Sequence, residues 1–294
     1  MSMATISDWI EGARPRTLPA AVAPVLAGSG VAWFAGGFDP VLAGLALVVS
    51  LALQLGVNYA NDYSDGIRGT DADRVGPLRL VGSGLVEPRW VRAAAVSCFA
   101  VAALAGLTAV WITGDWWLLG VGAAAIAAAW LYTGGPHPYG YLGLGEVFVF
   151  IFFGLVAVGG TVYLQLGSVP PAGWWTAIAV GALACAILVA NNLRDLDTDR
   201  LAGKLTLATK LGDRGTRAFF LALLGFSSLA VVGVAATSSW WALLGMLMAV
   251  TLIGPVIQVA SGVRGPRLIP VLKQTGLAEL ACAAGLAVGL LIAR

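Results

Sequence analysis

Two short acidic clusters follow apolar segments that are long enough to cross a bilayer. The first, NDYSDGIRGTD, covers residues 61–71, and the second, NNLRDLDTDRLAGK, covers residues 191–204. Carboxylates are costly to hold beside lipid, so a membrane protein seldom keeps them there without a use. Carboxylate oxygens bind Mg²⁺, which in turn binds phosphate oxygens. The two clusters therefore predict one divided site for magnesium and a diphosphate.

Within each cluster the spacing of the polar residues is helical. The residues that would share a helix face are Asn58, Asn61, Asp62 and Asp65 in the first cluster, and Asn191, Asp195 and Asp199 in the second. Asp197 would point elsewhere. For a single acidic loop, a solvated segment with helix caps would be the favoured interpretation. Two clusters of the same kind, each paired with asparagines, favour the divided site instead.

Amides and basic side chains accompany the carboxylates. The amides of Asn61, Asn191 and Asn192 could orient the carboxylates or bind phosphate directly. Further positive charge for a departing diphosphate would come from Arg74, Arg79, Arg194, Arg200 and Lys204.

The composition places these clusters in a polytopic, all-α membrane protein. Of its 294 residues, 59% are hydrophobic and 11% are charged, and a typical soluble domain has about 25% charged residues. We predict a bundle of nine transmembrane helices. The expected spans cover residues 17–36, 41–61, 90–112, 117–133, 146–166, 174–193, 217–236, 240–260 and 271–292.

The basic residues predict the orientation of that bundle. With nine spans, 16 of the 17 Lys and Arg residues fall on the side that holds the N-terminus, and the last is Arg294. The positive-inside rule therefore places this side in the cytoplasm of a bacterial cell membrane. The two long loops on this side, about 62–89 and 194–216, would form caps over one intramembrane domain that covers residues 1–294. Ala60-Asn61-Asp62-x-x-Asp65 resembles Ala190-Asn191-Asn192-x-x-Asp195, which favours two halves built on one pattern.

At these residues the chain resembles the UbiA-type intramembrane prenyltransferases. The resemblance rests on Asn61-Asp62-x-x-Asp65 and Asp195-x-x-x-Asp199 and covers the chain from near the N-terminus to the second long loop. Flanking stretches such as DRVGPLRLVGSG (73–84) and LYTGGPHPYGYLGLGE (131–146) are most similar to the branch that acts on 1,4-dihydroxy-2-naphthoate in menaquinone synthesis. The third acidic residue of the first cluster, Asp71, lies further from Asp65 than the family pattern places it, so it is not assigned to the metal.

The resemblance implies a mechanism for these residues. Asp62, Asp65, Asp195 and Asp199 would hold magnesium, expected as two ions, and the ions would bind a polyprenyl diphosphate. The diphosphate would leave with its charge stabilised by Lys204, Arg79 and Arg200. The naphthoate ring would attack the prenyl group at its carboxylated carbon, and carbon dioxide would leave. Asp65, Asp195, Asp199 and Lys204 are thus the expected catalytic residues.

Several further residues have two interpretations. Arg14 is either an interfacial anchor or part of the substrate site, and Glu146 is either a helix N-terminal carboxylate or a group near the acceptor ring. Tyr132 and Tyr141 could line the aromatic pocket, whereas Tyr139 is better explained as part of an interfacial belt. His137, between two prolines, is expected to be a turn residue.

Other functions are compatible with parts of this pattern. A divalent-cation transporter would place its acids near mid-span, whereas these lie at helix ends. A CDP-alcohol phosphatidyltransferase would gather its aspartates in one stretch. Within the UbiA superfamily, 4-hydroxybenzoate, homogentisate or haem remain alternative acceptors. Membrane lipid is an expected partner and nucleic acid is not.

Overall fold

The computed structural model describes residues 4–69 and 78–294, and within these ranges the regular structure is entirely helical. The elements are α1 (Ile6–Gly12), η1 (Pro15–Thr17), α2 (Pro19–Phe34), α3 (Pro40–Arg68), α4 (Pro88–Thr113), α5 (Leu118–Leu131), η2 (Tyr139–Tyr141), α6 (Gly145–Val149), η3 (Phe150–Val156), α7 (Ala157–Leu166), α8 (Pro171–Arg194), α9 (Leu196–Leu201), α10 (Leu207–Thr237), η4 (Trp240–Leu247), α11 (Met248–Ala260), η5 (Gly265–Leu268) and α12 (Ile269–Ile292).

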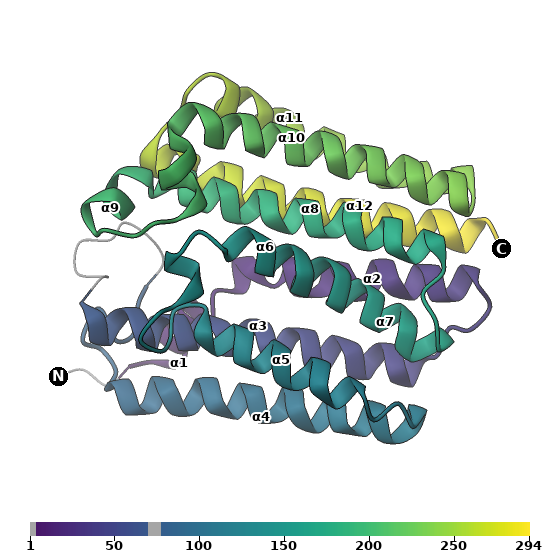
Figure 1. Cartoon of the computed structure of the whole chain (residues 1–294), viewed down its shortest axis with the longest axis horizontal. Coiled ribbons are helices and arrows are strands. Elements are labelled where there is room, and N and C mark those ends of the chain that lie inside the picture. Colours follow the sequence, from purple (N-terminus) through teal and green to yellow (C-terminus); the bar gives the residue numbers. More distant parts are fainter. Residues whose placement is uncertain (1–3, 70–77) are drawn as a thin grey trace.

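The long helices lie side by side and form one elongated bundle (Figure 1). The N-terminus and the short helix α9 lie at one end of the bundle, and the C-terminus lies at the other. Among the seven helical segments that are long and apolar enough to cross a membrane, α8 and the segment Gly265–Ile292, which contains α12, are the most enclosed, with 72% and 61% of their most apolar stretches buried. The prediction of an all-α bundle is confirmed.

The number of expected spans is confirmed only in part. Seven helical segments of the described chain are long and apolar enough to cross a membrane, and the pair Ile6–Thr17 and Pro19–Phe34, bent by 48°, would make eight. The span expected at 117–133 corresponds to α5, which has 14 residues and is therefore about 21 Å long, shorter than the hydrocarbon core. The apolar run continues into Tyr132, but the helix ends before the glycines and prolines at 134–138.

The segment between α6 and α7 is π-helical. In η3 each backbone N–H bonds five residues back, so this part of the span is wider than an α-helix. It packs closely on α8, because a Cβ at Gly154 would lie 2.7 Å from the carbonyl oxygen of Ala177. Only glycine permits this approach, and on the facing helix a Cβ at Gly181 would lie 3.1 Å from the ring of Phe150.

A carboxyl group is enclosed inside the helix α12. Glu279 is fully buried, and neither of its carboxyl oxygens has a hydrogen-bond partner within the described ranges. A buried polar group without a partner lowers stability. We expect Glu279→Leu to raise the melting temperature of the purified protein by about 2–4 °C and Glu279→Gln to raise it little. A lower melting temperature for Glu279→Leu would show that the carboxyl group makes a stabilising contact.

Candidate active site

One large cavity lies inside the bundle. Its volume is about 1670 Å³, and most of its wall is made of apolar side chains from α3, α4, α5, η3 and α12. The carboxylates enter it where α3 and α8 end: Asp65 lies in the last turn of α3, and Asp195 follows the last residue of α8. A cavity of this kind can hold a long apolar group and place a charged group at one end.

The structure brings most of the predicted site residues to this one cavity. Those that line it are Arg14, Asn58, Asn61, Asp65, Arg79, Tyr132, Tyr141, Asn191, Asn192, Asp195, Asp199 and Lys204. The two clusters are separated by 119 residues in the sequence. Their meeting is the geometric condition that a divided site requires.

Three predicted residues are placed differently, and a fourth is not described. Asp62, Glu146 and Arg200 are not among the residues that line the large cavity. Arg200 instead borders a small cavity of about 70 Å³ together with Asp213 and Arg264. Arg74 lies outside the described residues.

Tyr141 connects the two clusters. Its phenolic hydroxyl donates a hydrogen bond to Oδ1 of Asp65 at 2.5 Å, and its ring lies 4.7 Å from Nζ of Lys204. Lys204 in turn pairs with Asp199 at 3.8 Å. The backbone continues this connection, because the N–H of Leu205 donates to the carbonyl of Tyr141 at 3.1 Å. The loop between α5 and α6 therefore joins the end of α3 to the segment between α9 and α10.

Each of the three aspartates that line the cavity has a basic partner. Nη2 of Arg79 lies 3.5 Å from Asp65, and Arg194 donates two hydrogen bonds of 2.7 and 2.6 Å to Asp195. These pairs bring acidic groups together without leaving their charges uncompensated. They also place the basic side chains of Arg79 and Arg194 at the acidic end of the cavity.

Asp62 holds a neighbouring segment of the chain. Its two carboxylate oxygens accept hydrogen bonds from the backbone N–H groups of Leu80, at 2.7 Å, and Val81, at 3.1 Å. Asp62 is 1% exposed and Leu80 is fully buried. The carboxylate thereby fixes the position of the adjacent Arg79, which reaches Asp65.

Polar contacts also position the wall around Asn61. Its Oδ1 accepts a hydrogen bond of 2.7 Å from the hydroxyl of Thr133. Arg68, at the end of α3, donates to the carbonyl groups of Thr133 and Gly135. In the second cluster, Nδ2 of Asn192 donates to Oε1 of Glu146 at 3.0 Å. Glu146, which does not line the cavity, therefore orients an amide that does.

Two residues of the cavity wall were not predicted from the sequence. Tyr139, interpreted as an interfacial residue, lines the cavity and stacks on Phe148 with a centroid distance of 4.0 Å. Its hydroxyl donates to the carbonyl of Ala128, and burial raises the pKa of Tyr139 above its usual value. Gln54 was also missed, although a lone glutamine within an apolar helix was a detectable signal.

The donor set fits a cation that completes its coordination with a ligand. Within residues 4–69 and 78–294, no three Asp, Glu, His or Cys side chains are grouped closely enough to hold a metal ion alone. The cavity instead offers separate carboxylates next to amide groups. Mg²⁺ typically takes one or two carboxylates together with substrate phosphates, which agrees with this arrangement.

The fold and this cavity define a helical membrane protein with a large internal site, and comparison with known proteins gives its family. Residues 21–266 match the model of the UbiA prenyltransferase family, and the chain belongs to that family. A protein of Mycobacterium tuberculosis named 1,4-dihydroxy-2-naphthoate octaprenyltransferase is 52% identical over 97% of each chain. The Escherichia coli protein of the same name is 38% identical over 91% of this chain and 89% of its own.

Solved structures share the fold at low sequence identity. A UbiA homologue from Archaeoglobus fulgidus bound to GPP and Mg²⁺ superposes with a TM-score of 0.69 at 16% identity, covering 96% of this chain and 99% of its own. An apo UbiA homologue from Aeropyrum pernix gives 0.64 at 20% identity, with 99% of both chains covered. The multi-helix membrane architecture of this chain is therefore that of the UbiA fold.

Proposed function

We propose that this protein transfers a polyprenyl group from polyprenyl diphosphate to 1,4-dihydroxy-2-naphthoate, giving a demethylmenaquinol, carbon dioxide and diphosphate. The observation that carries the proposal is the meeting of Asp65, Asp195 and Asp199 at one large apolar cavity. The naphthoate acceptor is supported by two relatives named 1,4-dihydroxy-2-naphthoate octaprenyltransferase. They are 52% and 38% identical to this chain, and the matches extend over nearly its whole length. The whole of residues 1–294 would act as one intramembrane domain.

The acidic residues and the cations beside them would bind the diphosphate. Asp62, Asp65, Asp195 and Asp199 were predicted as metal ligands, and the three that line the cavity are the best placed for this role. Bound magnesium, expected as two ions, would neutralise negative charge on the leaving group. Arg79, Arg194 and Lys204 lie beside the same carboxylates and would shift towards the phosphate oxygens as the substrate enters.

The reaction then requires a dry cavity and an oriented acceptor. When the bond between prenyl C1 and the diphosphate oxygen breaks, its electron pair leaves with the diphosphate. The carboxylated ring carbon supplies the electrons of the new carbon–carbon bond. The electrons of its bond to the carboxylate return to the ring as carbon dioxide departs. The apolar wall formed by residues such as Phe148, Phe152 and Leu188 would keep water from the allylic cation.

The acidic end of the bundle is proposed to face the cytoplasm. Sixteen of the 17 basic residues fall on the side of the N-terminus if the segment 117–133 is counted as a crossing. In the structure the N-terminus and α9 share one end of the bundle, opposite to the C-terminus (Figure 1). This arrangement supports a location in a bacterial cell membrane with the substrate site on its inner side.

The proposed function is tested by an acceptor assay. Purified protein in detergent receives magnesium, a polyprenyl diphosphate and, in separate reactions, 1,4-dihydroxy-2-naphthoate, 4-hydroxybenzoate or homogentisate. We expect prenylation with release of carbon dioxide from the naphthoate and little product from the other two acceptors. Preferential prenylation of 4-hydroxybenzoate would overturn the acceptor assignment, and failure with all three would overturn the proposed function.

A further inference from the structure

A buried glutamine lies deeper in the cavity than the acidic residues. Gln54 is in the apolar part of α3, is 7% exposed and lines the large cavity. With 3.6 residues per turn, Gln54, Asn61 and Asp65 fall within about 40° of one another around the helix axis. Gln54 therefore continues the line of site residues inward, about 16 Å along the helix from Asp65.

The neighbouring hydrogen bonds determine which way the Gln54 amide points. Nδ2 of Asn58 donates to the carbonyl oxygen of Ala13 at 2.8 Å, and this oxygen can only accept. Oδ1 of Asn58 consequently faces Gln54 and accepts from Nε2 at 3.4 Å. The hydroxyl of Thr17 donates to the carbonyl of Arg14, so it accepts from Nε2 of Gln54 at 3.0 Å.

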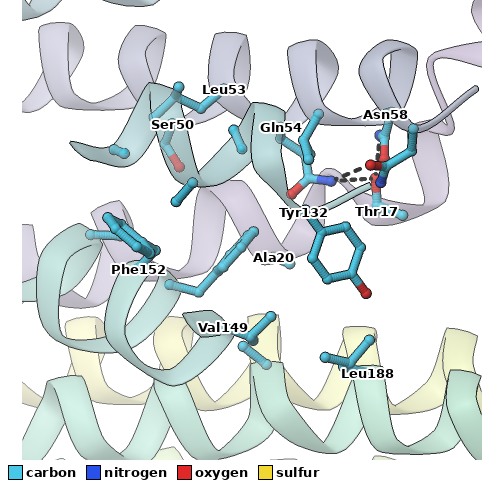
Figure 2. Close-up of a pocket in the computed structure, with 18 of the residues that line it drawn as sticks. Thr17, Ala20, Ser50, Leu53, Gln54, Asn58, Tyr132, Val149, Phe152 and Leu188 are labelled. Carbon is cyan, nitrogen blue, oxygen red and sulfur yellow. Dashed lines mark hydrogen bonds between the residues drawn. The ribbon is translucent and has the colours of Figure 1, made fainter. Parts of the chain in front are cut away.

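These contacts use only the amide nitrogen of Gln54, so its carbonyl oxygen can accept a hydrogen bond from a ligand. Oε1 is buried and has no hydrogen-bond partner within the described part of the chain. Figure 2 shows this oxygen pointing away from Asn58 and Thr17, on the side of Ser50, and it shows Phe152, Val149 and Leu188 on the facing wall. A network anchored on backbone carbonyls thus presents one hydrogen-bond acceptor in apolar surroundings.

The chemistry of this oxygen discriminates between the two substrates. An isoprenoid tail has no hydrogen-bond donor and would leave Oε1 unsatisfied. A ring hydroxyl can donate to it. The position also suits a ring, because the diphosphate would lie near Asp65 and the prenyl carbon that reacts would lie between the diphosphate and the acceptor.

We propose that Gln54 is a specificity-determining residue whose Oε1 accepts a hydrogen bond from the 4-hydroxyl group of 1,4-dihydroxy-2-naphthoate. This inference rests on the proposed function and goes beyond it by assigning one atom of the protein to one hydroxyl of the acceptor. The 4-hydroxyl group is the one that is not adjacent to the carboxylated carbon, so it can point inward while that carbon faces the prenyl group. Gln54 would thereby favour a ring with two hydroxyl groups.

The test compares two acceptors in two proteins. The acceptors are 1,4-dihydroxy-2-naphthoate and 1-hydroxy-2-naphthoate, which lacks only the 4-hydroxyl group, and the variant is Gln54→Met. The intrinsic reactivities of the two rings cancel when the ratio of their kcat/KM values is compared between the proteins. The ratio is kcat/KM for 1,4-dihydroxy-2-naphthoate divided by kcat/KM for 1-hydroxy-2-naphthoate. We expect it to fall at least about tenfold in the variant, because a polar site rejects an analogue that lacks its hydroxyl. The KM for polyprenyl diphosphate should stay nearly unchanged.

Two further variants keep the test decisive. Ser50→Ala is the matched control, because Ser50 lines the same cavity while its hydroxyl donates to the carbonyl of Ala21, and it should leave the ratio unchanged. Gln54→Asn keeps an amide, but its side chain is one methylene shorter, so its carbonyl oxygen no longer reaches the position of Oε1. This variant should also lower the ratio, and it provides the test if Gln54→Met does not fold.

The possible failures are distinguishable. If the unsubstituted protein uses the dihydroxy acceptor and the Gln54 variants lose activity equally with both acceptors, Gln54 has only a structural role and the inference is overturned. If the unsubstituted protein prenylates neither naphthoate, the proposed function falls, and the inference falls with it.

Discussion

Asp195→Ala is expected to lower kcat on the order of 10³-fold. The substitution removes a carboxylate that lines the large cavity and leaves Arg194 without its two hydrogen bonds to Asp195. The loss should appear in single-turnover measurements with saturating polyprenyl diphosphate, because the group would act on the departing diphosphate. Asp65→Ala should have an effect of the same order, since Asp65 reaches the cavity from the other cluster.

A matched control lies in the same acidic cluster. Asp197 is exposed and borders the small cavity together with Arg200, Asp213 and Arg264. Asp197→Ala should therefore retain nearly the full activity, with unchanged expression and membrane insertion. Equal losses for Asp195→Ala and Asp197→Ala would argue for a general effect of charge on folding and against a diphosphate site at Asp195.

The second large effect is expected for Asp62→Ala, through loss of a backbone anchor. The variant removes both acceptors for the N–H groups of Leu80 and Val81, so Arg79 loses its support. We expect kcat/KM for polyprenyl diphosphate to fall about 10- to 100-fold, the usual scale for a group that orients a ligand-binding residue. Trypsin should also cleave the variant faster after Arg79, since Leu80 is fully buried in the unsubstituted protein.

The proteolysis separates anchoring from metal binding. Asp65→Ala keeps both backbone hydrogen bonds of Asp62 and should show the original cleavage rate after Arg79. If Asp62→Ala changes only the magnesium dependence of turnover and leaves the cleavage rate as it was, Asp62 acts as a metal ligand and its backbone contacts have little importance.

The sequence was sufficient to predict which polar segments meet at the large cavity, because helical spacing is a local property. Continuing α3 beyond its apolar part places Asn58, Asn61 and Asp65 on one face, and all three line the cavity. Asp62 lies about 60° from Asp65 around the axis, at the edge of that face, and there it meets the segment that contains Leu80. Spacing alone could not show which neighbour would be present at that edge.

The contacts that join the clusters depend on the tertiary structure. Tyr141 reaches Asp65 only because Arg68 holds one end of its loop and the backbone of Leu205 holds the other. Composition suggested a pocket or an interfacial belt for the tyrosines, and the same aromatic character suits both. The short helix α5 was likewise hidden, because the apolar run predicts a span irrespective of where the helix ends.

The π-helical segment η3 has a consequence for how the cavity can be altered. Its extra residue per turn turns Phe152 and Phe153 towards the lumen, and both line it. Deleting a single residue between Phe150 and Val156 would restore ordinary α-helical hydrogen bonding, narrow this turn and change which of its side chains face the cavity. The width of the cavity therefore depends on the number of residues in η3 as well as on the volumes of its side chains. An insertion or deletion in η3 would change the shape of the cavity without changing any of the acidic residues.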